Sequence, residues 1–206
     1  MLDRIVADPR LHARLLNTLA RMEYVGARKI FKSRHADFLD GAGLQHALDE
    51  TAHAVRLKRA AEQVAAACAD DTTVVTTFSD EHTLAGHAGE GYLQGVDDAA
   101  EQALLDLPDP LRTEINYLMT SVAIEVRADS FYPVYDRVLE LAGSPFRVTA
   151  IFQDEIRHLA ERQRQLDDKF PGWRERIDQV LAQEELLFDR WLDAVEAACL
   201  AHAELD

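Results

Sequence analysis

The chain has 206 residues, which suffices for one domain with a large buried core, and 48% of them are hydrophobic, as in ordinary globular proteins. A formal net charge of −15 disfavours nucleic acids and anionic membranes as partners, because both would be repelled at long range. Only nine glycines and six prolines interrupt the chain, so we expect a single all-α domain over residues 1–206.

The first half of the chain predicts a helical hairpin. Apolar residues at three- and four-residue spacing indicate one helix over about 10–35 and another over about 44–69. The turn between them, at 37–43, holds two glycines and is short, so the two helices should be antiparallel neighbours. The pattern then weakens, and we expect one or two short helices within about 81–106 that return the chain along the bundle.

The second half predicts another hairpin. Pro108 and Pro110 indicate the start of a third long helix, because proline is tolerated in a first helical turn. Pro133 removes a backbone donor, so we expect it to kink or end that helix near Phe131.

A turn at 143–145 should begin the fourth helix, with Ser144 as its cap and Pro145 at its first position. Pro171 and Gly172 should end that helix, and a fifth helix is predicted over about 174–203. The predicted layout is therefore two short-looped hairpins joined by a long crossover, followed by an additional C-terminal helix.

A repeated motif with metal-ligand character is the most informative feature. Asp-Glu-x-x-His occurs at 49–53 and again at 154–158, and a lone Glu on an apolar helical stripe precedes each copy by 27 and 30 residues, counted from Glu to Glu. A Glu and a His three residues apart project from the same side of a helix, so each pair can hold one metal ion while a Glu from a facing helix supplements it. We predict a dinuclear centre with six ligands: Glu23, Glu50, His53, Glu125, Glu155 and His158.

The donor types narrow the choice of metal. Carboxylates with one imidazole per ion suit iron or manganese better than zinc or copper. A ligating imidazole normally donates its other N–H to a carboxylate, and we expect Asp49 and Asp154 to do this, each pointing at the opposite histidine. The alternative is that buried Glu–His pairs only bridge helices, although burying four carboxylates without a cation would be costly.

This pattern resembles the ferritin-like di-iron carboxylate superfamily, in which a four-helix bundle supplies one Glu from each of two helices and Glu-x-x-His from each of the other two. The resemblance covers about residues 10–168 and implies a ferritin-like four-helix bundle with a long crossover between its second and third helices. It also implies that the six ligands named above hold two iron ions, with manganese or a mixed manganese–iron pair as alternatives.

The second copy of the motif is similar to that of the oxygen-activating branch, which includes ribonucleotide reductase small subunits, acyl-carrier desaturases and bacterial multicomponent monooxygenases. The resemblance therefore implies an oxidoreductase that uses O2 on a small organic or carrier-bound substrate. An external electron donor should be needed, since two cysteines are too few for a rubredoxin-type site or an iron–sulfur cluster.

Two other functions stay open. Bacterioferritins and rubrerythrins share much of the motif, so a ferroxidase, a peroxidase or an iron-handling protein is the first alternative. The 75 residues between Glu50 and Glu125 disfavour it, because a compact cage subunit needs fewer. A metal-free helical interaction protein is the second alternative, and a homodimer is not excluded.

Several residues near the ligands are candidates for further roles. Asp129, four residues after Glu125, should relay protons or act as an additional carboxylate, unless it forms an ion pair with Arg127 or Arg162. Tyr132 and Tyr24 are candidate redox-active or catalytic tyrosines, with helix packing as the alternative. His46 is either a further ligand, a proton shuttle or a core histidine. Small or apolar residues one turn from the ligands should line a substrate pocket: Leu19, Ala27, Val122, Phe152 and Leu159.

The remaining signals concern location. Cys68 and Cys199 are expected to be buried free thiols, which fits a reducing compartment. The first residues lack the features of a signal peptide, and no apolar run is long enough to span a bilayer. We therefore expect a cytoplasmic protein.

Overall fold

The structure is a computed structural model that describes residues 1–33, 39–68 and 74–203. Within these ranges the chain is helical and forms no β-strand, which confirms the expected all-α class. The α-helices are α1 (Leu2–Ala7), α2 (Pro9–Ser33), α3 (Gly41–Ala66), α4 (Gly86–Gln102), α5 (Leu111–Leu141), α6 (Thr149–Lys169) and α7 (Arg174–Ala203), with two 3-10 turns, η2 (Asp80–His82) and η3 (Pro171–Trp173).

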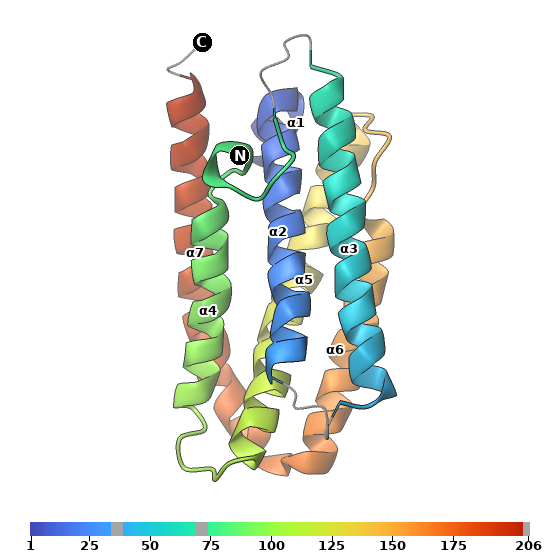
Figure 1. Ribbon diagram of the computed structural model, residues 1–206. Helices are drawn as coiled ribbons and strands as arrows, with labels where there is room; N and C mark the ends of the chain where they lie inside the picture. Colours follow the sequence, from blue (N-terminus) through green and yellow to red (C-terminus); the bar gives the residue numbers. More distant parts are fainter. Residues whose placement is uncertain (34–38, 69–73, 204–206) are drawn as a thin grey trace.

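The long helices form a bundle in which each one runs antiparallel to the one before it (Figure 1). Helices α2 and α3 make one hairpin, and α5 and α6 make the other. Helix α4 follows the 3-10 turn η2 and carries the chain back along the bundle, so that α5 starts at the end opposite to the one where α3 finished. The expected crossover therefore contains one helix of 17 residues, α4.

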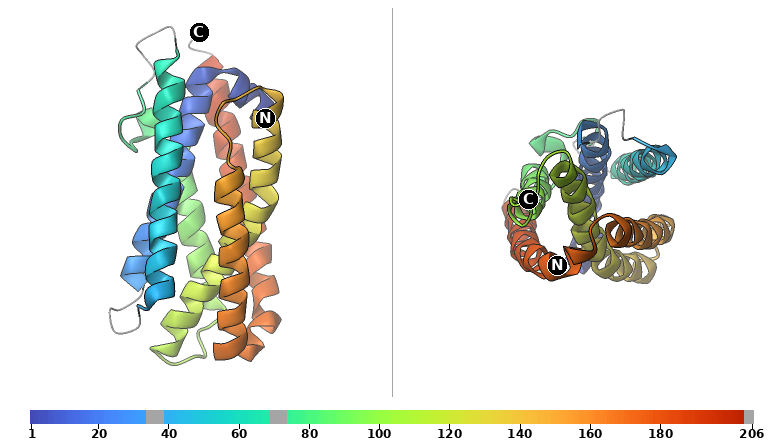
Figure 2. Two further views of the ribbon diagram at one scale, coloured as in Figure 1. Left: turned by 90° about the vertical axis from the view of Figure 1, so that its right-hand side faces the viewer. Right: turned by 90° about the horizontal axis from the view of Figure 1, so that it is seen from below.

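Helices α4 and α7 lie side by side on one flank of the bundle, as the view from below shows (Figure 2). Helix α4 contacts α2 and α5, and α7 contacts α5, whereas α3 and α6 lie away from this flank. The two hairpins consequently face each other on one side of the molecule, and α4 and α7 cover the other side of α2 and α5.

The inward stripes of the long helices carry both the core and the acidic residues. On α5, Ile115, Leu118 and Val122 are buried at three- to four-residue spacing, and Glu125 continues the same stripe. On α3, Leu57 and Glu50 share a buried face in the same way. Because a helix places such positions on one side, these carboxylates are directed into the centre of the bundle.

Helix α5 corrects one part of the expectation for Pro133, because the helix does not end near Phe131 but is continuous from Leu111 to Leu141 with Pro133 inside it. Pro133 is exposed, and so is Asp129, whose carbonyl lies four residues earlier and loses its helical donor. Solvent can satisfy that carbonyl, while buried Tyr132 and Tyr135 on either side of the proline hold the helix against its neighbours.

The start of α6 corrects the expectation for Ser144. The helix begins at Thr149 rather than at Pro145, and the Ser144 hydroxyl instead accepts a bond from the backbone N–H of Phe146 at 3.2 Å. The Asp136 carboxylate on α5 accepts from the backbone N–H of Val148 at 3.0 Å and from the side chain of Arg147. A side chain from the neighbouring helix therefore holds the connection in a non-helical course until Thr149.

Part of the expected turn at 37–43 lies outside the described residues. In its described part, the Asp40 side chain accepts from the backbone N–H of Gly43 at 2.8 Å and caps α3, which therefore starts earlier than expected.

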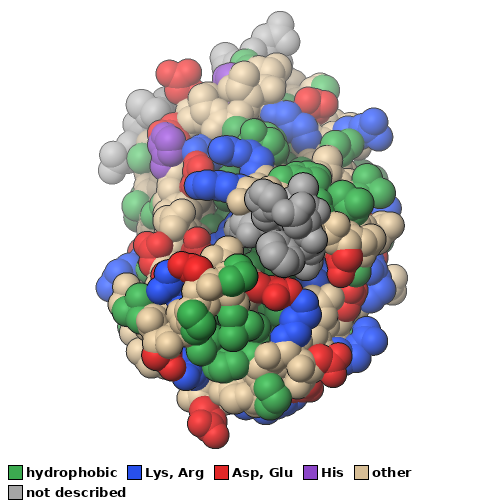
Figure 3. Space-filling model, turned by 60° about the horizontal axis from the view of Figure 1, so that its bottom comes forward, with side chains coloured by type: hydrophobic (Ala, Val, Ile, Leu, Met, Phe, Trp, Pro, Cys, Tyr) green, Lys and Arg blue, Asp and Glu red, His purple; other side chains and the backbone are tan. Residues whose placement is uncertain are grey.

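The lower face of the molecule carries charged side chains of both signs around smaller hydrophobic patches (Figure 3). None of the described helices is both long and apolar enough to cross a membrane.

Candidate metal centre

The structure brings all six predicted ligands together in the middle of the bundle. Glu23 comes from α2, Glu50 and His53 from α3, Glu125 from α5, and Glu155 and His158 from α6. Their oxygen and nitrogen atoms fall into three overlapping groups, within each of which the atoms lie no more than 4.8 Å apart. Glu50 and Glu155 each belong to two groups, so they lie where a carboxylate bridging two ions would lie.

Each predicted imidazole ligand points one nitrogen at these carboxylates. Nδ1 of His53 lies 3.0 Å from Glu155 Oε1 and 3.6 Å from Glu23 Oε2. Nδ1 of His158 lies 3.7 Å from Glu155 Oε2 and 3.8 Å from Glu50 Oε1. Both histidines are almost fully buried, and each therefore joins carboxylates from both hairpins.

The other nitrogen of each imidazole contacts the aspartate expected for it. Nε2 of His158 lies 3.0 Å from Asp49 Oδ2, and Nε2 of His53 lies 3.2 Å from Asp154 Oδ2. The predicted contact of each aspartate with the opposite histidine is confirmed. Arg157 ties the two aspartates together, because its Nη2 donates to Asp49 at 2.9 Å and to Asp154 at 3.0 Å. These contacts fix the orientation of both rings.

The charges of the cluster are unfavourable without a cation. Burial, followed by repulsion from Glu155, raises the pKa values of Glu50 and Glu125 well above the usual value. Burial alone would lower the pKa of His53, but the neighbouring carboxylates of Glu155 and Glu23 outweigh it and raise that pKa to about 11. Both carboxylate oxygens of Glu125 are buried and lack a hydrogen-bond partner among the described residues. Bound cations would satisfy these oxygens and oppose the repulsion, so the donor set fits a metal centre.

The further candidates on α5 separate into one that reaches the centre and one that does not. The hydroxyl of Tyr132 donates to Glu23 Oε1 at 2.5 Å, and the side chain is buried. Asp129 is exposed and belongs to none of the groups, which corrects its expected place beside Glu125. Four residues rotate a helix about 40° past a full turn, whereas the seven residues from Glu125 to Tyr132 fall only about 20° short of two turns.

The alternative ion-pair partners proposed for Asp129 have other contacts. Arg127 binds the buried Glu184 of α7 with Nε and Nη2 at 2.9 and 2.7 Å, and Arg162 donates to Gln165 at 3.0 Å. Tyr24 is 43% exposed and stacks on Phe78, so it points away from the centre.

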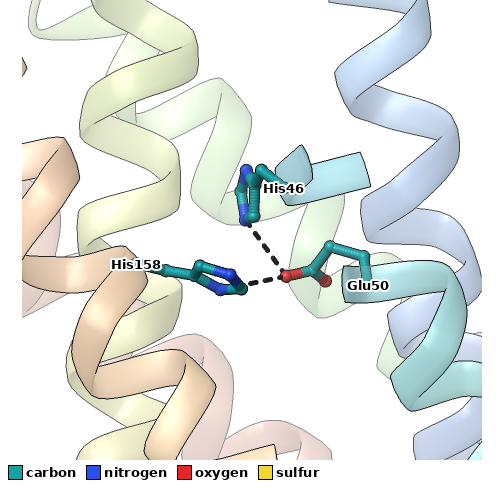
Figure 4. Close-up of side chains that lie close together, drawn as sticks. All are labelled: His46, Glu50 and His158. Carbon is teal, nitrogen blue, oxygen red and sulfur yellow. Dashed lines mark ion pairs between the residues drawn. The ribbon is translucent and has the colours of Figure 1, made fainter. Parts of the chain in front are cut away.

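His46 also belongs to the cluster, because it forms a group of potential ligand atoms with Glu50 and His158. Its Nε2 lies 3.1 Å from Glu50 Oε1, the same oxygen that Nδ1 of His158 faces at 3.8 Å (Figure 4). Its Nδ1 lies 2.7 Å from the Tyr117 hydroxyl. Burial, followed by the charges of Arg162 and His158, lowers the pKa of His46 to about 2, so the ring is neutral.

An apolar cavity of about 120 Å³ lies against the cluster. Glu23, Glu50, Glu125 and Glu155 contribute to one wall, together with His46. The remaining lining comes from α2, α4, α5 and α7 and is mainly hydrophobic, including Leu19, Leu93, Ile124, Phe131, Phe188 and Trp191.

The sequence-based pocket prediction was right for Leu19, but Ala27, Val122, Phe152 and Leu159 do not line this cavity. Half of the hydrophobic lining residues named above belong to α4 and α7. The apolar periodicity of α4 and α7 indicated only that each helix packs against the rest of the bundle. It did not indicate which side of the centre the two helices cover.

The two cysteines differ in burial, because Cys199 is buried and Cys68 is only partly buried.

No protein-family model, no curated protein and no solved structure matches the chain. The interpretation of the site therefore depends on its own geometry.

Proposed function

We propose that this protein is a dinuclear carboxylate oxidoreductase of the ferritin-like type, which binds two iron ions and uses O2 to oxidise or hydroxylate a small apolar substrate. The observation that carries this proposal is the contact between the cluster of carboxylates and imidazoles and a mainly apolar cavity. A metal centre that opens onto such a cavity has room for an organic molecule beside it.

The topology supports the ferritin-like assignment. Helices α2 and α3 run in opposite directions, α4 returns the chain along the bundle, and α5 therefore runs parallel to α3 (Figure 1). Two antiparallel hairpins joined by a long crossover are the arrangement expected for that bundle. The ligands come from all four helices of the two hairpins, two from α3, two from α6 and one each from α2 and α5.

When bound, two ferrous ions would supply the electrons with which O2 is first reduced. The protein's own groups determine what surrounds that chemistry. Asp49 and Asp154 hold the rings of His158 and His53 in place, which keeps Nδ1 of each directed at the centre. The Tyr132 hydroxyl holds a proton at Glu23 and can supply it to a basic oxygen there. The mainly hydrophobic lining would surround a bound molecule with apolar side chains.

The cavity limits the substrate. An apolar protein cavity of roughly 150 Å³ accommodates benzene, so one of 120 Å³ suits a molecule of about that size or the apolar end of a carrier-bound chain. At the α7 side, the half-buried Arg127 donates to the buried carboxylate of Glu184, which also accepts from the Tyr92 hydroxyl. This wall therefore offers few unpaired polar groups to a substrate. Net hydroxylation would place one atom of O2 in a C–H bond and release the other as water, with two electrons from an external donor and two protons.

The test is aerobic turnover after anaerobic loading with ferrous iron. We expect two ions per chain and, with ascorbate as donor and toluene as probe, an oxidised product that carries label from 18O2. Ala128→Leu should fill the cavity beside Glu125 and abolish product formation while two ions still bind. Ala150→Leu, at an exposed site on α6, is the matched control and should be fully active.

Two other outcomes would overturn the proposal. Iron that is oxidised without substrate and accumulates far beyond two ions per chain would indicate a ferroxidase or an iron-handling protein. A chain that binds no ferrous iron would be a helical interaction protein.

A further inference from the structure

Three histidines, rather than the two in the repeated motif, face the carboxylates. His46 is 5% exposed and lies on α3 one turn before Glu50. Its Nε2 lies 3.1 Å from Glu50 Oε1 and 3.7 Å from Glu125 Oε1, and its ring centroid lies 4.5 Å from that of His158. A set of potential ligand atoms is therefore formed by His46, Glu50 and His158 (Figure 4).

The three imidazoles share one arrangement. Each presents one nitrogen to the carboxylates and has the other nitrogen within hydrogen-bonding distance of a polar side chain. For His53 and His158 that side chain is an aspartate, and for His46 it is the Tyr117 hydroxyl at 2.7 Å. An orienting partner on the outer nitrogen is the usual feature of a metal-bound histidine. It leaves Nε2 of His46 as the nitrogen directed at the centre.

The second hairpin has no counterpart of His46. The position one turn before Glu155 is Ile151, which is buried and apolar. The two Glu-x-x-His motifs thus have different residues beside them, and the additional imidazole lies on one side of the centre only.

We propose that Nε2 of His46 is a ligand of the ion that is also held by Glu50, Glu125 and His158, so that this ion has two imidazoles and the other ion has one. The inference depends on the dinuclear centre proposed above. The other ion would be held by Glu23, Glu50, Glu155 and His53, which form a separate group of potential ligand atoms. Unequal donor sets make the two sites unequal in affinity, because imidazole favours the later divalent first-row ions more than carboxylate does.

Cobalt(II) alone is the probe, because it is stable in air and shifts the NMR signals of protons near it. The wild-type protein should bind two Co²⁺ per chain in two resolved calorimetric steps, with the two-imidazole site filling first. Three strongly shifted signals that disappear in D2O should be seen, one from the outer ring N–H of each coordinated histidine.

His46→Ile makes the first hairpin resemble the second. We expect the tighter binding step to weaken by more than about tenfold and the shifted N–H signals to fall from three to two. His12→Asn is the matched control, because His12 is also buried and bonded to a tyrosine hydroxyl, that of Tyr135 at 2.9 Å, but belongs to none of the ligand groups. It should retain both steps and all three signals.

Tyr117→Phe separates coordination from packing. This substitution removes the hydrogen-bond partner of His46 Nδ1 but leaves His46 Nε2 directed at the centre. The signal of the His46 ring N–H should therefore remain, and its proton should exchange faster with solvent. Two signals in the wild type, unchanged by His46→Ile, would overturn the role of His46 while leaving the dinuclear centre intact. If the wild-type protein bound no Co²⁺ and no ferrous iron, the proposed function itself would fail.

Discussion

The two hairpins carry equivalent ligands in unlike surroundings. Three residues after its lone Glu, α2 has Gly26 where α5 has Ala128. One turn before its motif Glu, α3 has His46 where α6 has Ile151. A Cβ atom at position 26 would lie 2.9 Å from Glu50 Oε2, so the space beside Glu50 depends on a glycine.

Under the proposed function, this difference separates the residues that would bind two ions from those that would direct their chemistry. Four carboxylates and two histidines repeat because each ion needs similar donors. The residues around them differ because the cavity lies on one side of the centre only, where α4 and α7 cover α2 and α5. The following substitutions compare equivalent positions of the two hairpins.

Exchanging each motif Glu for Gln should have the largest effect. Glu50→Gln and Glu155→Gln should both prevent stable binding of two ions, measured by anaerobic dialysis against ferrous iron, since each carboxylate lies in two of the ligand groups.

The same two substitutions should change the stability of the metal-free protein in opposite directions. Folding raises the pKa of Glu50, so its carboxylate opposes folding above the unfolded-state pKa, and Glu50→Gln should stabilise the protein at pH 7 by roughly 1–3 kcal/mol. The neighbouring imidazoles of His158 and His53 outweigh burial and lower the pKa of Glu155, so Glu155→Gln should be destabilising by a similar amount. Urea unfolding measures both, and equal signs would contradict this electrostatic account.

Removing the charge of an orienting aspartate should have the next largest effect. Asp154→Asn and Asp49→Asn should keep the fold, as judged by circular dichroism, and weaken Co²⁺ binding by about 10–100-fold. The Asp49 side chain is 15% exposed and that of Asp154 is 34% exposed, so the loss should be greater for Asp49. Unchanged affinity in both variants would show that the aspartates do not orient the rings.

Gly26→Ala should have a smaller effect that is confined to the first hairpin. The new methyl group forces the Glu50 carboxylate to move, and we expect Co²⁺ affinity to fall about fivefold, or about 1 kcal/mol. The metal-free protein should gain roughly 0.5–1 kcal/mol from the better helix former. Ala128→Gly, at the equivalent position of α5, is the control and should leave the affinity unchanged.

A last effect, separate from the comparison of the two hairpins, concerns His12, the buried histidine outside the centre. Burial lowers its pKa from 6.5 to about 4, so the unfolded chain binds more protons at this residue between those pH values. Its contribution to stability is therefore complete above pH 6.5 and is lost as the pH falls towards 4. In the metal-free protein, His12→Gln should reduce the pH dependence of unfolding in this range by at most about 1.4 kcal/mol per pH unit. Urea titrations of both proteins at pH 7 and pH 5 would measure this change. An equal loss of unfolding free energy between the two pH values in the wild type and in His12→Gln would contradict the prediction.

The spacing of the residues was enough to predict the long helices and the gathering of Glu23, Glu50, Glu125, Glu155, His53 and His158. Helical periodicity determines which side chains share a face, and acidic residues on an otherwise apolar face must enter the interior. The predicted partners of both imidazoles were also right, because one turn of helix separates each aspartate from its own histidine and leaves it facing the other hairpin.

The tertiary structure decided the features that depend on contacts between distant segments. Pro133 stays within a helix because the backbone carbonyl that loses its hydrogen-bond donor lies on the exposed side of α5. Helix α6 starts later than expected because Asp136 of α5 binds the residues that precede it. By periodicity Asp129 lies about 40° and Tyr132 about 20° from the direction of Glu125, and the packing of neighbouring helices at these two angles buries Tyr132 and leaves Asp129 exposed.

The cavity has the same origin, because α4 and α7 enclose it from outside the two hairpins that carry the ligands. A local sequence pattern specifies the direction of a side chain relative to its own helix. What that side chain meets depends on which helices pack beside it, and that is settled only when the whole chain has folded.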